Sequence, residues 1–208
     1  MKKYLVEFIG TFFLVLAVVC AVNGLGDNSF MAPVAIGSTL MVMIFAGGHI
    51  SGAHYNPAVS VAVLIRGKME SKDFVPYVVA QILGGSLAAL IASNVFGFSG
   101  TPGSLAVAPA LLAEILGTFA LAYVILNVAT TKSNEGNSFY GLAIGFTVTA
   151  MAYTLGGISG GAFNPAVAIG ITLAEMATWG DIWIYLLGTV AGGVLAAIVF
   201  GITYGKGD

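Results

Sequence analysis

The sequence repeats itself. Asn56-Pro57-Ala58 returns as Asn164-Pro165-Ala166, 108 positions further on, and the stretch 35–59 aligns without gaps on the stretch 143–167. Earlier in each copy, EFIGTF from Glu7 resembles EILGTF from Glu114. A duplication of this length indicates two copies of one structural unit that complete each other's core. We expect one domain over 1–208, with repeats at about 1–97 and 106–208.

Each copy has three apolar stretches long enough to cross roughly 30 Å of hydrocarbon as helices. Only 8% of the residues are charged, whereas a soluble domain carries about 25%. So few charges cannot cover the chain with a solvated surface, so lipid must face much of it. The sequence therefore predicts an all-α membrane protein with six spans, near 4–23, 33–48, 74–95, 109–129, 139–156 and 181–203.

Two further apolar stretches, near 56–66 and 164–175, are too short to span a bilayer. Each begins with Asn-Pro-Ala, and this start is typical of a helix N-terminus: Asn caps the helix and Pro suits its first turn. We interpret both as half-helices that enter the membrane and turn back. The Gly-rich backbone before each of them is tolerable at that depth only if it lines a wet pore.

Three spans per copy is an odd number, so the second copy must be inverted relative to the first. If both termini are cytoplasmic, every basic residue falls on the cytoplasmic side, as the positive-inside rule requires. We therefore expect a multi-pass protein of the plasma or inner membrane with both termini cytoplasmic. These basic residues are Lys2, Lys3, Arg66, Lys68, Lys72, Lys132 and Lys206.

In this topology the two Asn-Pro-Ala tips meet near the bilayer midplane. The first turn of a helix has unpaired N–H groups and the positive end of the helix dipole. Asn56 and Asn164 add side-chain amide donors at the same place. Such a pair of tips repels cations and weakly holds a neutral molecule that has acceptor oxygens.

These residues carry a resemblance to the aquaporin, or major intrinsic protein, family. It covers nearly the whole chain and rests on 48–59, the second Asn-Pro-Ala, and the pair Glu7 and Glu114. The resemblance implies a homotetramer in lipid, with one pore per subunit for water and small neutral solutes. It also implies that the two glutamates support the loops before the half-helices, the alternative being a proton or ion site. We expect His54 to line the inner pore mouth and His49 to brace the loop; pH gating by either is the alternative.

The family's second, outer selectivity filter aligns with Ile36, Ala152, Gly161 and Val167. Val167 stands where the family usually has Arg, and Ala152 stands where strict water channels often have His. Plant vacuolar members that resemble this chain over 161–167 also lack the Arg, and they include channels for urea, hydrogen peroxide or ammonia. We therefore expect a wider filter and a similar range of solutes. Ala168, where the glycerol-conducting branch commonly has Asp, argues against that branch.

Other functions fit the sequence less well. A secondary transporter also uses inverted repeats and broken helices, but it needs midplane groups for a coupling ion or a charged substrate. An intramembrane enzyme would need a catalytic pairing or a metal-ligand cluster, and the sequence has neither. A purely structural junction protein is the third alternative. We expect no enzymatic activity, cofactor, metal or nucleic-acid partner.

Overall fold

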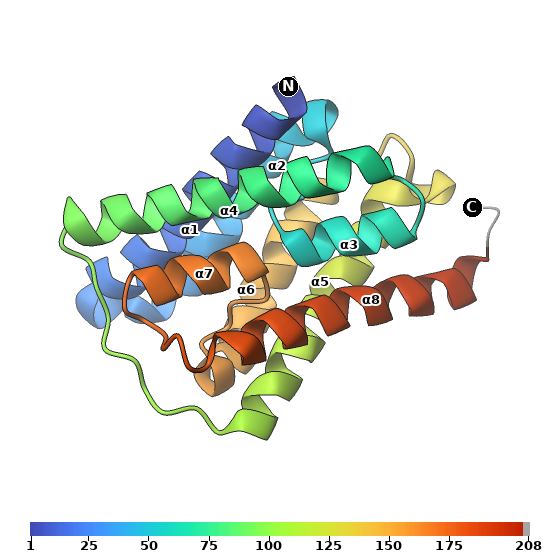
Figure 1. Ribbon diagram of the computed structural model, residues 1–208. Coiled ribbons are helices and arrows are strands. Elements are labelled where there is room, and N and C mark those ends of the chain that lie inside the picture. Colours follow the sequence, from blue (N-terminus) through green and yellow to red (C-terminus); the bar gives the residue numbers. More distant parts are fainter. Residues whose placement is uncertain (206–208) are drawn as a thin grey trace.

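The computed structural model describes residues 1–205, so Lys206 lies outside the described residues. Six helices in this part are long and apolar enough to cross a membrane, and each lies within a few residues of a predicted span. They are α1 (Lys2–Gly24), α2 (Ala32–Ser51), α4 (Ser71–Asn94), α5 (Val107–Thr130), α6 (Tyr140–Ser159) and α8 (Ile182–Tyr204) (Figure 1). The two short helices are α3 (Pro57–Ile65) and α7 (Pro165–Leu173), and the 3-10 turns are η1 (Gly26–Met31) and η2 (Lys132–Asn134).

The half-helices form because the chain stops and restarts a helix at matched places in the two copies. Helices α2 and α6 end at Gly52 and Gly160, whose φ angles of 85° and 92° are left-handed. Glycine adopts this conformation without steric cost, so it ends a helix cleanly. Asn56 and Asn164 then cap the new helices from an extended backbone, with a proline in each first turn.

The two copies interlock. Within each copy the first span packs along the third: α1 along α4, and α5 along α8. The short helices cross over, because α7 packs against α4 of the first copy and α3 packs against α8 of the second. Figure 1 shows α3 and α7 starting near the middle of the molecule and running outward in opposite directions between α4 and α8.

Glycines let the packed spans approach closely. A Cβ atom on Gly84 of α4 would lie 2.3 Å from the carbonyl oxygen of Phe8 on α1. The equivalent glycine of the second copy, Gly192 of α8, would meet the Ile115 carbonyl oxygen at 2.5 Å. No side chain fits at either place, so glycine sets the distance between the two long helices in both copies.

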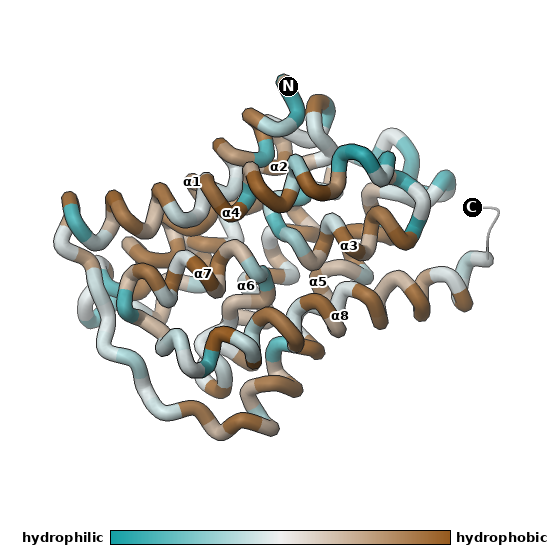
Figure 2. Tube along the Cα trace, in the orientation of Figure 1, coloured by the Kyte–Doolittle hydropathy of each residue, from teal (hydrophilic) through white to brown (hydrophobic). Residues whose placement is uncertain are grey.

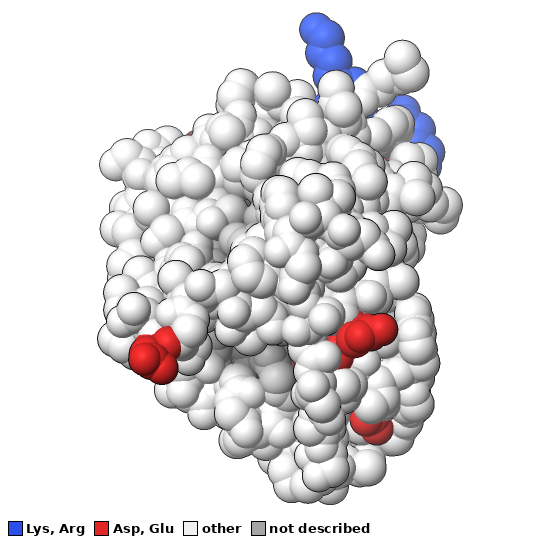
Figure 3. Space-filling model, turned by 90° about the vertical axis from the view of Figure 1, so that its left-hand side faces the viewer, with Lys and Arg blue, Asp and Glu red and all other residues white. Residues whose placement is uncertain are grey.

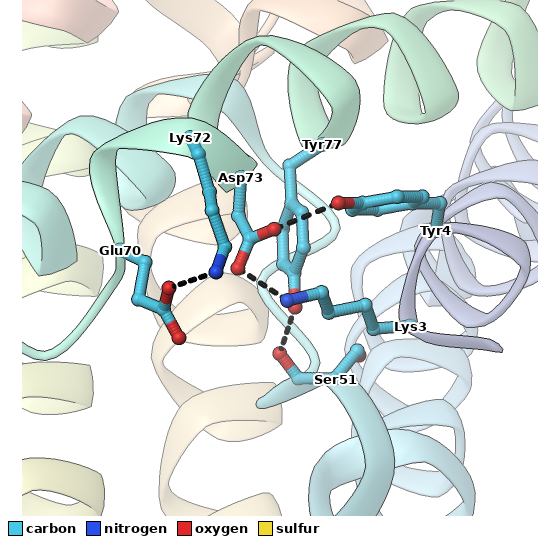
Figure 4. Close-up of polar contacts among 7 residues, drawn as sticks. All are labelled: Lys3, Tyr4, Ser51, Glu70, Lys72, Asp73 and Tyr77. Carbon is cyan, nitrogen blue, oxygen red and sulfur yellow. Dashed lines mark hydrogen bonds and ion pairs between the residues drawn. The ribbon is translucent and has the colours of Figure 1, made fainter. Parts of the chain in front are cut away.

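Charge separates the two ends of the molecule. Figure 2 shows apolar helices with hydrophilic residues at their ends, most strongly around the start of α4. There, Lys3 forms an ion pair with Asp73, Tyr4 donates a 2.7 Å hydrogen bond to the same carboxylate, and Lys72 pairs with Glu70 (Figure 4). Figure 3 shows the side at the left in Figure 1, where acidic side chains stand out and Lys and Arg project only at the upper edge.

Gly84→Ala should weaken the packing of α1 on α4, since the added methyl meets backbone that cannot rotate away. We expect a loss of about 1–3 kcal/mol in stability, measured as a lower unfolding temperature by tryptophan fluorescence in detergent. Gly201→Ala on α8 is the matched control, because a Cβ atom there meets nothing within 4 Å. Equal unfolding temperatures for the two variants would contradict this account.

Candidate functional site

The two Asn-Pro-Ala tips are joined by reciprocal hydrogen bonds. Asn56 Nδ2 donates to the carbonyl oxygen of Phe163 at 2.9 Å, and Asn164 Nδ2 donates to the carbonyl oxygen of Tyr55 at 2.8 Å. Each asparagine thus holds the residue that precedes the other tip. The structure brings together two segments more than a hundred residues apart, as the inverted repeat predicts.

The asparagine side chains carry free donors at both tips. Asn56 Oδ1 accepts from the backbone N–H of Ala58 at 2.8 Å, and Asn164 Oδ1 accepts from Ala166 at 2.9 Å. The caps therefore occupy backbone N–H groups that, from the sequence, we expected to be open to a passing molecule. An amide nitrogen has two N–H donors, so each Nδ2 keeps one hydrogen beyond its bond to the opposite carbonyl. Both asparagines line the cavity described below.

A buried carboxylate holds the irregular backbone before each tip. Glu7 is fully buried and accepts at Oε1 from Ser51 Oγ (2.7 Å) and the His54 N–H (3.0 Å), and at Oε2 from the Tyr55 N–H (2.7 Å). Glu114 does the same in the second copy, with Ser159 Oγ, the Ala162 N–H and the Phe163 N–H at 2.7, 3.0 and 2.7 Å. Each carboxylate therefore accepts three hydrogen bonds from one helix end and the loop that follows it.

Sequence reasoning missed Gln81 on α4. Its Nε2 donates to Glu7 Oε2 at 2.8 Å and to Ser60 Oγ at 3.1 Å, and its side chain is fully buried. The residue that corresponds to Gln81 in the second copy is Thr189. Its hydroxyl donates to the Tyr185 carbonyl oxygen within its own helix. The only signal was a lone polar residue inside an apolar span, without a partner in the repeat.

A cavity of about 380 Å³ runs past the two tips, and we call it the central cavity. All four predicted filter positions line it, from three helices and one loop: Ile36 on α2, Ala152 on α6, Gly161 before α7, and Val167 in the first turn of α7. We call these four residues the filter. Among the described residues that line the central cavity, none is Asp, Glu, Lys or Arg. A molecule in it therefore meets neutral side chains and the two asparagine amides.

The two histidines differ from their expected places. His54 lines the central cavity but is nine-tenths buried, with Nδ1 3.0 Å from Ser60 Oγ, and it lies deeper than a pore mouth. His49 is exposed and lines a second cavity of about 700 Å³ together with Lys68 and Lys132. The structure thus places His49, rather than His54, at a mouth, and it gives His49 no bracing hydrogen bond within residues 1–205.

The fold and the cavity define a pore-forming protein of the membrane. The chain matches the family described as Major intrinsic protein over residues 1–200. Aquaporin AqpM of Methanothermobacter thermautotrophicus is 35% identical and covers 96% of each chain. Aquaporin NIP1-1 of Zea mays is 38% identical, over 94% of this chain and 72% of the relative. The glycerol uptake facilitator protein-like 6 of Lactiplantibacillus plantarum is 35% identical, over 95% of each.

A solved structure shares the fold of this chain. The X-ray structure of the aquaglyceroporin from Plasmodium falciparum superposes with a TM-score of 0.82, over 96% of this chain and 94% of that one, at 23% identity, which shows a shared fold. The chain belongs to the major intrinsic protein, or aquaporin, family. It is a multi-pass membrane channel for water or small neutral solutes and is not an enzyme.

Glu114→Ala should destabilise the protein and close the pore. It leaves one hydroxyl and two backbone N–H groups buried without an acceptor, and each such group costs about 1–3 kcal/mol. We expect a lower unfolding temperature and little water flux in proteoliposomes. The control is Glu70→Ala, at an exposed position that lines neither cavity, which should match the wild type. A stable, conducting Glu114→Ala variant would contradict the supporting role of this carboxylate.

Proposed function

We propose that this chain is a passive channel for water and also for ammonia, urea and hydrogen peroxide. The observation that carries the proposal is the chemistry of the filter: its side chains are two aliphatic groups, one methyl and one hydrogen, and they line the same cavity as both asparagine amides. Small polar molecules that would be stopped by a charged, narrow filter meet no charge here. The likeness to plant vacuolar members rests on residues 161–167 alone.

Ion exclusion in this proposal falls to the midplane. The N-termini of α3 and α7 point their positive dipole ends at the same place, and such opposed half-helices form a barrier to protons and cations. A water molecule that accepts from both asparagine amides is poorly oriented to relay a proton. Without an arginine at 167, no positive side chain adds to this barrier.

Orientation and assembly are part of the same proposal. Lys3 pairs with Asp73 beside the start of α4, and Lys68 and Lys132 line the same mouth as His49. We place this basic end and both termini in the cytoplasm of a plasma or inner membrane. We also propose a homotetramer with one pore per subunit, as the family resemblance implies.

A secondary transporter remains the alternative, because broken helices in an inverted repeat are shared with that class. Its coupling ion would need a free carboxylate in the membrane. Glu7 and Glu114 are the acids buried there, and backbone and side-chain donors from the loops engage both of them. Linear flux that needs no ion gradient supports a channel; saturable, ion-dependent uptake would support a transporter.

Proteoliposomes in a stopped-flow instrument test the solute range. The wild type should conduct water, urea, ammonia and hydrogen peroxide, with low glycerol flux because Ala168 replaces the aspartate of the glycerol branch. Glycerol belongs in the panel because a relative bears the name glycerol uptake facilitator protein-like. Water flux without the other three would overturn the proposed range of solutes, and glycerol flux as large as urea flux would overturn the argument from Ala168.

Val167→Arg should narrow the range of solutes. The guanidinium fills part of the filter and adds a charge, so we expect urea and peroxide flux to fall about tenfold or more, corresponding to ~1.4 kcal/mol of added barrier, while water flux falls less. Val167→Leu is the control, since leucine is close to valine in size and carries no charge. Unchanged urea flux in the arginine variant would contradict the assignment of Val167 to the filter.

A further inference from the structure

Two cavities meet on the basic side of the asparagine tips. The cavity lined by His49, Lys68 and Lys132 lies at the basic end, and we call it the inner cavity. The central and inner cavities are separate, yet they share four lining residues and no others. These four, which we call the inner ring, are Ile44 on α2, Ala53 before α3, Ile125 on α5 and Ile144 on α6.

Three residues of the inner ring are the repeat counterparts of filter residues. Positions 108 residues apart correspond in the two copies, so Ile44 corresponds to Ala152 and Ala53 corresponds to Gly161. The third pair is Ile144 with Ile36 of the filter. The inverted duplication has therefore placed corresponding residues on each side of the asparagine tips, although Val59, the counterpart of Val167, lines the central cavity only.

The two constrictions differ in bulk. The inner ring has isoleucine where the filter has alanine (Ile44 and Ala152), and alanine where the filter has glycine (Ala53 and Gly161). Ile125 corresponds, 107 positions earlier, to the smaller Val18, which lines the central cavity. In each of these four pairs, the inner-ring side chain is as large as its counterpart or larger.

Burial agrees with the difference in size. The inner-ring side chains are 3–8% exposed, whereas Ile36, Ala152 and Gly161 of the filter are half-buried and its fourth residue, Val167, is 3% exposed. The central cavity also continues past the filter, because the same cavity is lined by Val22, Ser29 and Pro33 beyond it. Thus the central cavity extends to both sides of the filter and meets the inner cavity at the inner ring.

We propose that the inner ring, rather than the filter, is the limiting constriction of this channel and sets both its water permeability and the largest solute it passes. The inference rests on the proposed channel function. None of the four side chains has a donor or acceptor, so a polar molecule crossing the ring loses hydrogen bonds that these side chains cannot replace. Narrow apolar constrictions of this kind control permeation through how readily they are wetted.

The test exchanges residues between the two constrictions. Ile44→Ala gives the inner ring the residue of the filter, and we expect water permeability to rise at least about threefold and urea permeability to rise more. Ala152→Ile gives the filter the residue of the inner ring. It places two similar barriers in series, so water flux should fall by no more than about twofold. Ile198→Ala on α8, which is 49% exposed on the outside of the molecule, is the matched control.

The outcomes separate the two proposals. Unchanged flux in Ile44→Ala together with strong block in Ala152→Ile would place the limit at the filter and overturn the inner-ring proposal while leaving the channel intact. A folded wild type that conducts none of the solutes would overturn the channel function itself. The unfolding temperature of each variant shows whether it folds. If Ile44→Ala does not fold, Ile125→Val takes its place, because it removes one methylene from the same ring. Water flux through Ile125→Val should rise, and an unchanged flux would count against the proposal.

Discussion

The structure depends on satisfying irregular backbone in the middle of a membrane. Lipid offers no hydrogen bonds, so any backbone there that is not helical must find partners within the protein. Glu7 and Glu114 supply them, and each carboxylate accepts from two successive N–H groups and a serine hydroxyl of one loop. With the loops held, the chain can turn back and start a helix at the bilayer centre. The asparagine tips, the cavity and the constrictions all follow from that turn.

Much of this could be read from the sequence. Span positions follow from unbroken apolar runs, because the bilayer thickness fixes the length of a spanning helix. Asn-Pro-Ala marks both half-helices because capping and proline at the first turn are local effects. The resemblance to the family also grouped Ile36, Ala152, Gly161 and Val167, and all four line the central cavity.

Other features depend on tertiary contacts that have no local pattern. Gln81 reads as an isolated polar residue, and its role appears only when α4 lies beside Glu7 and Ser60. The histidines were misplaced because the left-handed turn at Gly52 carries His54 inward and leaves His49 on the last turn of α2. One residue of the inner ring, Ile125, lies on α5, outside the stretch of the repeat that aligns without gaps.

The crossed packing of the short helices bears on how the protein is made. Helix α3 has its most extensive contacts with α8, which comes more than a hundred residues later in the chain, whereas α7 finds α4 already made. A newly made first copy therefore lacks the surface on which its own half-helix rests. The first half-helix can be fully packed only after α8 has been made, so the two copies of this duplicated chain, though alike in structure, differ in their order of maturation.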